Sequence, residues 1–486
     1  MTEIPSTKEG EDRLSSLPDA LLIEIISLLP SNAAIATALL SPQWRGLWAH
    51  ITSVDIDTRQ FLHRLDACSA INQVIEKFIS PLIRTFSLRV YDQNVKHIFF
   101  SGVMDSWFCR ICDRNVEEIS LKILDSKSDY KFSSPWSVFP TPWCVFQTPS
   151  LVVLELDSDI PRRCYGISDD IITSKVIITL PNLKKLSIRV SHDECQGWGK
   201  LIESCPSLEV LSMVVVLTKG IYVVDEPAIN LSITSRNLVR LNLSVLVYEM
   251  ASVVVDTPRL EYLRSEVLIL SKFVFVNKPN SIREAFISFD DGYGNNWFME
   301  LLQSISNVSS LTLCIRDDYV MITAAVLLAN LTYLRLEMSY FLMYMVLLRL
   351  LNSCPSMEVL VLRVSNNFYP NHLIPINGYD FVPLCLMTRI KMIEIEAFSL
   401  YYYDNWSFLL RYFLISAQVL ERLIFTQFYS NNSGFQKSEF WKELSAYKRS
   451  SPMCEIEFSS LFGKMPSKMR SFFQMSDICG GNTHIS

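Results

Sequence analysis

The first apolar pattern of the chain lies in residues 12–57 and predicts three short helices. Its first stripe has helical spacing and consists of Leu21, Leu22, Ile25, Ile26 and Leu29. Pro18 suits the first helical position, where its missing N–H costs nothing, and Pro30 ends the helix. Ser31 is a candidate N-cap for a second, alanine-rich helix, and a third expected helix carries Trp44. Three short helices make a small core, so the leftover apolar surface indicates a partner.

From about residue 83 the pattern changes to apolar-x-x-apolar-x-apolar, which returns along the rest of the chain. The copies open at Ile83, Val116, Leu151, Leu183, Leu208, Leu238, Leu260, Ile282, Val308, Leu331, Met357, Ile390 and Leu420. Their mean spacing of about 28 residues and their strand motif resemble leucine-rich repeats. A single repeat cannot bury its apolar strand face, so stacked repeats predict a continuous core and a parallel sheet.

Internal identity supports the repetition. Residues 204–211 and 353–360 both read Ser-Cys-Pro-Ser-x-Glu-Val-Leu. Helix-like runs are expected between strands at residues 198–203, 297–305 and 340–351.

The last patterned segment reads Arg-Ser-Ser-Pro-Met-Cys-Glu-Ile-Glu-Phe from Arg449 to Phe458. It predicts a turn at Pro452 and then an alternating strand with Cys454 and Ile456 on the same face as Phe458. A terminal repeat needs a cap over its exposed core, and this segment is in the right place to supply one.

Composition narrows the function classes. The 486 residues are 49% hydrophobic, which is ample material for a core, and the net charge of -6 argues against nucleic acid as a partner. The amino-terminal residues have no apolar signal-peptide core, and the uncharged run at residues 319–334 is too short to span a membrane. The twelve cysteines form no dense framework, so we expect reduced thiols and a location in the cytoplasm and/or nucleus.

Candidate chemistry is sparse. Cys109-x-x-Cys112 is the only pair of its kind, and a structural zinc site needs a second ligand pair, so no metal is expected. The local cluster at residues 192–195, His-Asp-Glu-Cys, follows a predicted strand and is interpreted as a solvated polar loop. Phosphate-binding loops, nucleophile elbows and metalloprotease motifs are not found, so no catalytic residue or cofactor is expected.

Residues 11–57 resemble an F-box in its plant form. The matching positions are Leu17-Pro18, Leu21-Leu22, Ile25-Ile26, Leu29-Pro30, Ala36-Thr37, Leu40-Ser41 and Trp44-Arg45-x-Leu47-Trp48. Pro42 and Asn32-Ala33 depart from the pattern at positions that are usually charged, but leave its apolar positions intact. The resemblance implies docking on the Skp-type adaptor of cullin-RING (SCF) ubiquitin ligases. The residues it assigns to that contact are Leu17, Pro18, Leu21, Leu22, Ile25, Leu29, Leu40 and Trp44.

The run at residues 449–458 resembles the FBD region that closes many plant F-box/leucine-rich-repeat proteins. The whole resemblance implies an α/β fold: a three-helix F-box, a leucine-rich-repeat solenoid with a parallel-sheet horseshoe, and an FBD-like cap. The expected layout is a disordered tail at 1–10, the F-box at 11–57, repeats at 58–415, the FBD-like region at 416–462 and a mostly disordered tail at 463–486.

Strand alternation points the residues between the apolar positions outward, where a target could bind. The candidate target-binding residues are Arg189, Arg240, Arg264, Arg335, Arg363 and Glu394. Mixed charge with interleaved aromatic residues suits a protein surface better than a phosphate backbone.

The family resemblance implies a non-catalytic substrate-recognition subunit of an SCF-type E3 ubiquitin ligase, with a target protein of unknown identity on the repeats and neither nucleic acid nor membrane as partner. Two alternatives stay open: an F-box interaction protein without ligase output, and a small-molecule (hormone-like) co-receptor that holds its ligand in the repeats.

Overall fold

The computed structural model describes residue 14 and the ranges 16–60, 64–91, 98, 102–124, 138–158, 164–166, 178–216, 229–246, 251–267, 270–289, 297–315, 326–365, 382–397, 403–427, 442 and 444–460. The two tails expected to be disordered, at 1–10 and 463–486, lie outside these residues. The chain forms two compact units, one of residues 1–282 and 295–305 and the other of residues 283–294 and 306–486.

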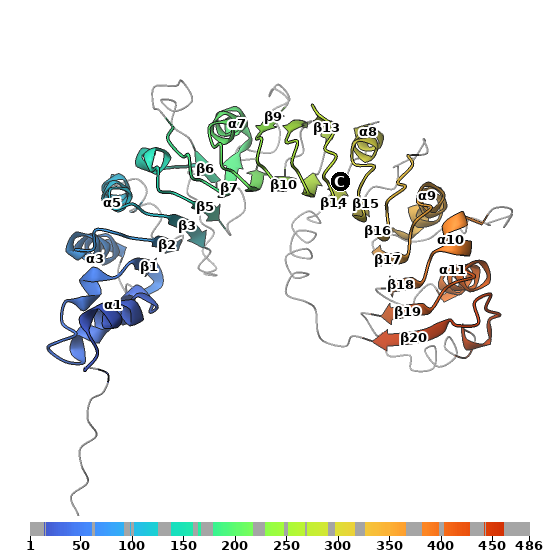
Figure 1. Cartoon of the computed structure of the whole chain (residues 1–486), viewed down its shortest axis with the longest axis horizontal. Helices are drawn as coiled ribbons and strands as arrows, with labels where there is room; N and C mark the ends of the chain where they lie inside the picture. Colours follow the sequence, from blue (N-terminus) through green and yellow to red (C-terminus); the bar gives the residue numbers. More distant parts are fainter. Residues whose placement is uncertain are drawn as a thin grey trace, which may run out of the picture. The chain divides into compact units, whose positions relative to one another are not determined.

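The first unit begins with helical elements and continues as a parallel sheet (Figure 1). Its helices are α1 (Asp19–Ser27), α2 (Ser31–Ala36), η1 (Thr37–Leu39), η2 (Leu47–His50), η3 (Thr58–Gln60), α3 (Arg64–Lys77), α5 (Val103–Cys112), η4 (Trp143–Gln147), η5 (His192–Glu194), α7 (Cys195–Glu203) and α8 (Trp297–Ser304). Its main-sheet strands are β1 (Ser53–Asp57), β2 (Thr85–Tyr91), β3 (Glu118–Leu124), β5 (Val153–Ser158), β7 (Lys185–Ser191), β8 (Val210–Val216), β10 (Arg240–Leu246) and β12 (Tyr262–Val267).

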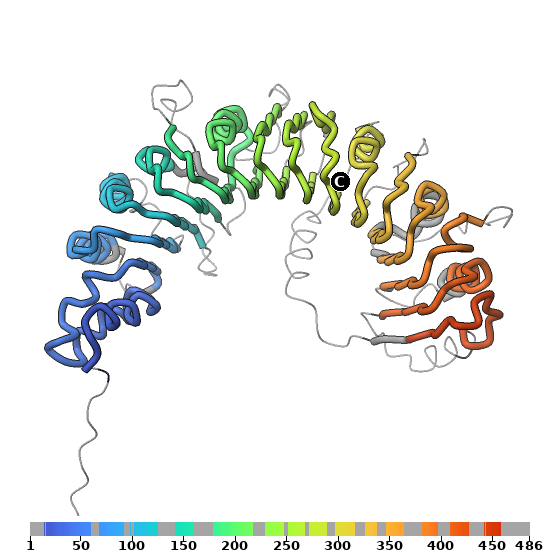
Figure 2. Tube along the Cα trace, in the orientation of Figure 1, coloured from blue at the N-terminus to red at the C-terminus, as the bar shows by residue number. Residues whose placement is uncertain are grey.

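The second unit repeats the same alternation. Its described strands are β14 (Glu284–Phe289), β15 (Ser310–Ile315), β16 (Tyr333–Ser339), β17 (Val359–Ser365), β18 (Met392–Ala397), β19 (Arg422–Gln427) and β20 (Glu455–Ser460). Its described helices are α9 (Tyr340–Ser353), α10 (Leu384–Thr388) and α11 (Tyr403–Ser416). Within each unit the strands stack in chain order, as the colour sequence along the trace shows (Figure 2). The α/β solenoid predicted from the repeats is therefore confirmed.

The repeat motif located the strands accurately. Each of the thirteen predicted openings lies two residues before a strand, and each opening residue is buried. Neighbouring strands pair in parallel so that apolar positions meet, as Leu211 meets Leu241 and Leu334 meets Leu360. The same-face alternation of buried and half-buried residues builds one apolar layer per unit.

The sheet starts earlier than predicted, with β1 inside the range assigned to the F-box. Ile51, Val54 and Ile56 fit the repeat motif and are buried, and β1 pairs with β2 in parallel. The repeat motif of β1 was thus present in the sequence, but it was assigned to the F-box because it directly follows the helical pattern.

At the other end, β20 pairs with β19 and continues the sheet, as the alternating pattern after Pro452 predicted. The Ser451 hydroxyl donates to the carbonyl oxygen of Leu420 (2.6 Å), and Arg449 donates to the carbonyl oxygen of Cys454 (2.8 Å). Cys454 is buried, while the side chain of Phe458 lies outside the described part.

A second parallel sheet of the first unit was not predicted. Its strands are β9 (Ile229–Thr234), β11 (Ala251–Asp256) and β13 (Leu270–Phe275), in the order β13-β11-β9. Here α7 packs against β9 and α8 against β13, so strands take the place of helices in these repeats. A further short pair, β4 (Val138–Pro140) and β6 (Cys164–Gly166), lies beside β7. Among the described helices, none is long and apolar enough to cross a bilayer.

Gly199→Ala is expected to destabilise the first unit, because α7 approaches β9 closely at this residue. A Cβ at Gly199 would lie 2.9 Å from the carbonyl oxygen of Ser232, which is backbone and cannot rotate away. Overpacking of this kind costs about 1–3 kcal/mol. The helix propensity gained from alanine, about 1 kcal/mol, offsets only part of that. Thermal unfolding should show a lower Tm than the wild type, while Glu203→Ala on the exposed side of the same helix should not.

Candidate functional site

The helix α1 divides its apolar stripe between the core and the surface. Leu22 and Ile26 are fully buried, whereas Leu21 is 48% and Ile25 38% exposed. Leu21 and Ile25 are one helical turn apart, so both face outward from the same side of α1. Exposed apolar side chains that gather on one side of a helix are typical of a surface that binds a partner.

Further leucines of the same region are also exposed. Leu29 and Leu40 are exposed as expected for contact residues, and Leu40 is 65% exposed. Sequence reasoning missed Leu28 and Leu39, which are 86% and 89% exposed. Leu28 follows Leu21 by seven residues, so the helical period could have found it. We call Leu21, Ile25, Leu28, Leu29, Leu39 and Leu40 the exposed leucine face.

Two residues assigned to the adaptor contact lie elsewhere. Leu22 and Trp44 are both buried, so they belong to the core and not to the exposed leucine face. Leu17 is half-buried and Pro18 is exposed just before α1. The carbonyl oxygen of Pro18 accepts hydrogen bonds from the N–H groups of Leu21 (3.0 Å) and Leu22 (3.2 Å), so Pro18 fixes the start of the helix.

The third expected helix is replaced by turns and the short 3₁₀ helix η2. Gly46 has φ 95°, a left-handed conformation that interrupts an α-helix, and η2 begins directly after it. The interruption still places Trp44 and Leu47 in the core.

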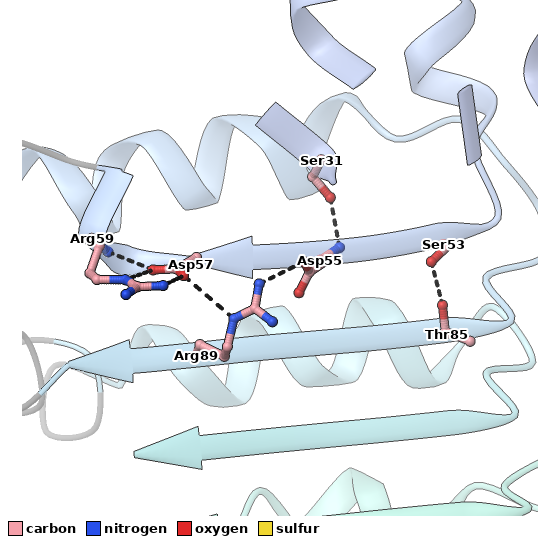
Figure 3. Close-up of polar contacts among 7 residues, drawn as sticks. All are labelled: Ser31, Ser53, Asp55, Asp57, Arg59, Thr85 and Arg89. Carbon is pink, nitrogen blue, oxygen red and sulfur yellow. Dashed lines mark hydrogen bonds and ion pairs between the residues drawn. The ribbon is translucent and has the colours of Figure 1, made fainter. Parts of the chain in front are cut away.

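A polar junction on β1 and β2 joins the amino-terminal helical region to the sheet (Figure 3). Ser31 does not cap α2; Pro30 occupies the N-cap position, and the Ser31 hydroxyl accepts from the N–H of Asp55 (2.6 Å). Arg89 of β2 pairs with Asp55 (2.7 Å) and lies 3.5 Å from Asp57. The start of α2 is therefore tied to the first strand pair of the sheet, which holds the F-box against the repeats.

Asp57 is the buried member of this junction, and Arg59 pairs with it at 2.8 Å. Burial by itself raises the pKa of a carboxyl group, but hydrogen bonds from the Arg59 side chain and backbone outweigh it and lower the pKa of Asp57 below its ordinary value of 3.8. A lowered pKa means that the junction contributes stability above that ordinary value and loses it as the pH falls through the lowered one.

Asp57→Asn should therefore reduce stability at neutral pH by about 1–3 kcal/mol, because it weakens hydrogen bonds made by charged groups. The difference from the wild type should shrink as the pH falls from 3.8 through the lowered pKa of Asp57, because the wild-type carboxyl group is protonated only below that lowered value. Chemical denaturation at several pH values measures this. Asp105→Asn, at an exposed position of α5, is the matched control and should show neither effect.

The outward residues of the first unit's sheet are paired with one another. Arg189 lies 3.6 Å from Asp157 on the neighbouring strand, and Arg264 pairs with Glu266 on its own strand. The guanidinium of Arg240 stacks over the ring of Tyr262 at 4.3 Å from its centroid. Of the three predicted arginines, Arg189 and Arg264 thus lie beside carboxylates, and Arg240 lies over an aromatic ring.

In the second unit the predicted residues come together around Glu396. Arg335 makes two hydrogen bonds to this carboxylate (3.0 and 2.7 Å), and Arg363 lies 3.9 Å from it and 3.8 Å from Glu337. Burial, followed by repulsion from Glu396, raises the pKa of the neighbouring Glu394. Glu394 lies on the same strand as Glu396, and the Arg335 charge and the Thr426 side chain offset part of this rise in its pKa.

Among the described residues, no group of three or more potential ligands could hold a metal ion. The expectation of a solvated loop at residues 192–195 is wrong in part. His192 and Cys195 are buried, because η5 and α7 follow β7 directly, and the Nε2 atom of His192 lies 2.9 Å from Asp193. Burial raises the pKa of the Cys195 thiol to about 12, which makes it a poor nucleophile.

No family model matches the chain. Individual proteins of Arabidopsis thaliana do. F-box/FBD/LRR-repeat protein At2g26030 is 25% identical over 92% of this chain and 98% of its own length. F-box/FBD/LRR-repeat protein At5g22660 is 27% identical over 92% of this chain and 97% of its own. F-box/LRR-repeat protein 13 is 26% identical over 79% of this chain and 83% of its own. The resemblance predicted from the sequence is confirmed: over about 92% of its length, this chain is a relative of the plant F-box/FBD/LRR-repeat proteins.

Proposed function

We propose that the chain is the substrate-recognition subunit of an SCF-type ubiquitin ligase. The observation that carries this proposal is the exposed leucine face, which lies in a region that resembles an F-box. F-boxes dock on Skp-type adaptors, and through the adaptor on a cullin. Leu21, Ile25 and Leu40 are exposed in the free chain and would be covered in that complex.

The repeats would hold the target protein on the outward residues of their strands. These residues include arginines and tyrosines, such as Arg240 and Tyr262, and both residue types are enriched at protein interfaces. The chain would perform no bond chemistry itself. Its contribution is proximity, since a bound target presents its lysines at high effective concentration to the charged E2 enzyme. We place the protein in the cytoplasm and/or nucleus.

The two alternatives have less support. A receptor for an anionic small molecule needs basic side chains whose charge is not already balanced by acidic neighbours. Arg189, Arg335 and Arg363, however, already pair with carboxylates. An interaction protein without ligase output would have the same leucine face, so only the presence of a cullin in the complex separates it from a ligase subunit.

The test is affinity purification of the tagged chain from plant cells with the proteasome inhibited, followed by mass spectrometry. Wild type is compared with the double variant Leu21→Asp/Ile25→Asp, which places two charges on the exposed leucine face. The matched control is Val276→Asp, which replaces an apolar residue of the same unit that is also exposed but lies outside the F-box.

The expected result is that the wild type and Val276→Asp retain adaptor, cullin and target. The double variant should lose adaptor and cullin, retain the target, and protect it from degradation. Adaptor without cullin in the wild-type sample, with an unchanged target lifetime, would support the interaction protein instead.

A further inference from the structure

The fold brings Cys144 towards Cys109 and Cys112, which lie 35 and 32 residues before it in the sequence. Cys109 and Cys112 are three residues apart on α5, so they share one face of the helix. The helix packs against η4, which carries Cys144. The thiol of Cys144 lies within hydrogen-bonding reach of Cys112 and of Cys109. The Thr148 hydroxyl donates to the carbonyl oxygen of Cys144 (2.9 Å) and fixes the end of η4.

The three thiols differ in access to solvent. Cys144 is buried, whereas Cys109 and Cys112 are half-buried, so a small oxidant can reach the thiols of α5 first. The effect of the neighbouring Cys144 thiol outweighs that of burial and lowers the pKa of Cys112. The same contact, with burial, raises the pKa of Cys144. Cys112 is thus the better nucleophile of the pair, and Cys144 keeps its proton until a disulfide forms.

We propose that Cys112 and Cys144 form a reversible disulfide when the chain meets hydrogen peroxide. The Cys112 thiolate attacks one peroxide oxygen, the O–O bond breaks, and hydroxide leaves, which gives a sulfenic acid at Cys112. The Cys144 thiol then displaces the sulfenic oxygen as water and forms the S–S bond. Two thiols and one peroxide become one disulfide and two waters, and each sulfur is oxidised by one electron. A thiol reductant reverses the step by exchange.

The second unit supplies an internal control. Cys354 and Cys385 are also neighbours, but both are fully buried, and the Cys385 thiol donates to the carbonyl oxygen of Leu351 (3.2 Å). Burial raises the pKa of Cys385 to about 11. Because Cys354 and Cys385 are close together but inaccessible, they should resist the oxidant that links Cys112 to Cys144. Comparing the two pairs therefore separates the effect of proximity from the effect of solvent access.

The experiment treats the reduced, folded full-length chain with hydrogen peroxide, blocks the remaining thiols by alkylation under denaturing conditions, and maps tryptic peptides without reductant. Trypsin cuts after Arg110 and Arg114, so Cys109 and Cys112 fall in different peptides and Cys144 falls in a third, residues 132–162. We expect a linked peptide that joins residues 111–114 to 132–162, lacks two hydrogen atoms relative to the separate peptides, and disappears after treatment with reductant.

Two variants complete the test. Cys144→Ser should abolish the linked peptide and leave Cys112 oxidised to a sulfenic acid that a dimedone probe labels. Cys354→Ser should leave the linked peptide unchanged. The proposal is overturned if Cys112 in the wild type stays alkylatable under peroxide, or if it is oxidised without a link to Cys144. It is also overturned if the Cys354–Cys385 link forms as readily, because then only unfolded chains are being oxidised.

Discussion

Leu360→Asp should unfold the second unit, and Leu211→Asp should do the same in the first. Both leucines are fully buried and each meets apolar residues on both neighbouring strands, as Leu360 meets Leu334 and Ile393. A buried carboxylate without a partner is among the most costly substitutions, so a loss of about 4 kcal/mol or more in the free energy of unfolding is expected. Since each repeat packs only on its neighbours, the damage should spread through the unit.

The matched control for Leu360→Asp is Leu327→Asp, which makes the same chemical change at an exposed leucine of the same unit. Circular dichroism with temperature should show an early transition for Leu360→Asp and a wild-type transition for Leu327→Asp. Unchanged melting of both Leu211→Asp and Leu360→Asp would contradict a solenoid with a continuous core.

Leu21→Asp/Ile25→Asp should weaken binding to a Skp-type adaptor by at least about thirty-fold, because truncating a central apolar anchor of an interface often costs about 2 kcal/mol or more. Both side chains are exposed in the free chain, so their replacement should leave the fold intact. Isothermal titration with purified adaptor measures the change, and Val276→Asp should bind as the wild type does.

Point variants test adaptor binding more specifically than removal of the amino-terminal region does. A deletion of residues 1–56 would remove most of β1, which pairs with β2, together with the buried residues Ile51 and Val54. It would also remove Asp55, which pairs with Arg89. A loss of target binding after such a deletion would therefore report damage to the repeats as well as loss of the F-box.

The repeat strands could be predicted because their signal is local and is repeated. One motif places an apolar opener two residues before each strand, and burial of that opener is a requirement of every repeat, from Ile83 to Leu420. The helices α7, α8 and α9 could be predicted for a similar reason, since each carries an apolar run between two strands. The second sheet could not, because the pairing of β9, β11 and β13 depends on how neighbouring repeats stack.

The residues of the candidate site were predicted less completely than the strands. A sequence pattern assigns a residue to a helix or strand, but it does not decide whether the side chain faces the core or the solvent. Leu21 and Leu22 are adjacent, and only the packing of α1 puts Leu22 inside and Leu21 outside. Ser31 has the right residue type for an N-cap, but its hydroxyl accepts from Asp55 of the next strand. Cys144 joins Cys109 and Cys112 only after two elements pack, which no spacing in the sequence indicates.

The measurement that tests the proposed function most directly is titration of a purified Skp-type adaptor into the folded wild-type chain, in parallel with Leu21→Asp/Ile25→Asp. We expect saturable binding at one adaptor per chain, lost in the double variant while its melting curve stays that of the wild type. Absence of binding to a wild-type chain that melts cooperatively, or equal affinity in the double variant, would contradict the F-box assignment and the ligase function with it.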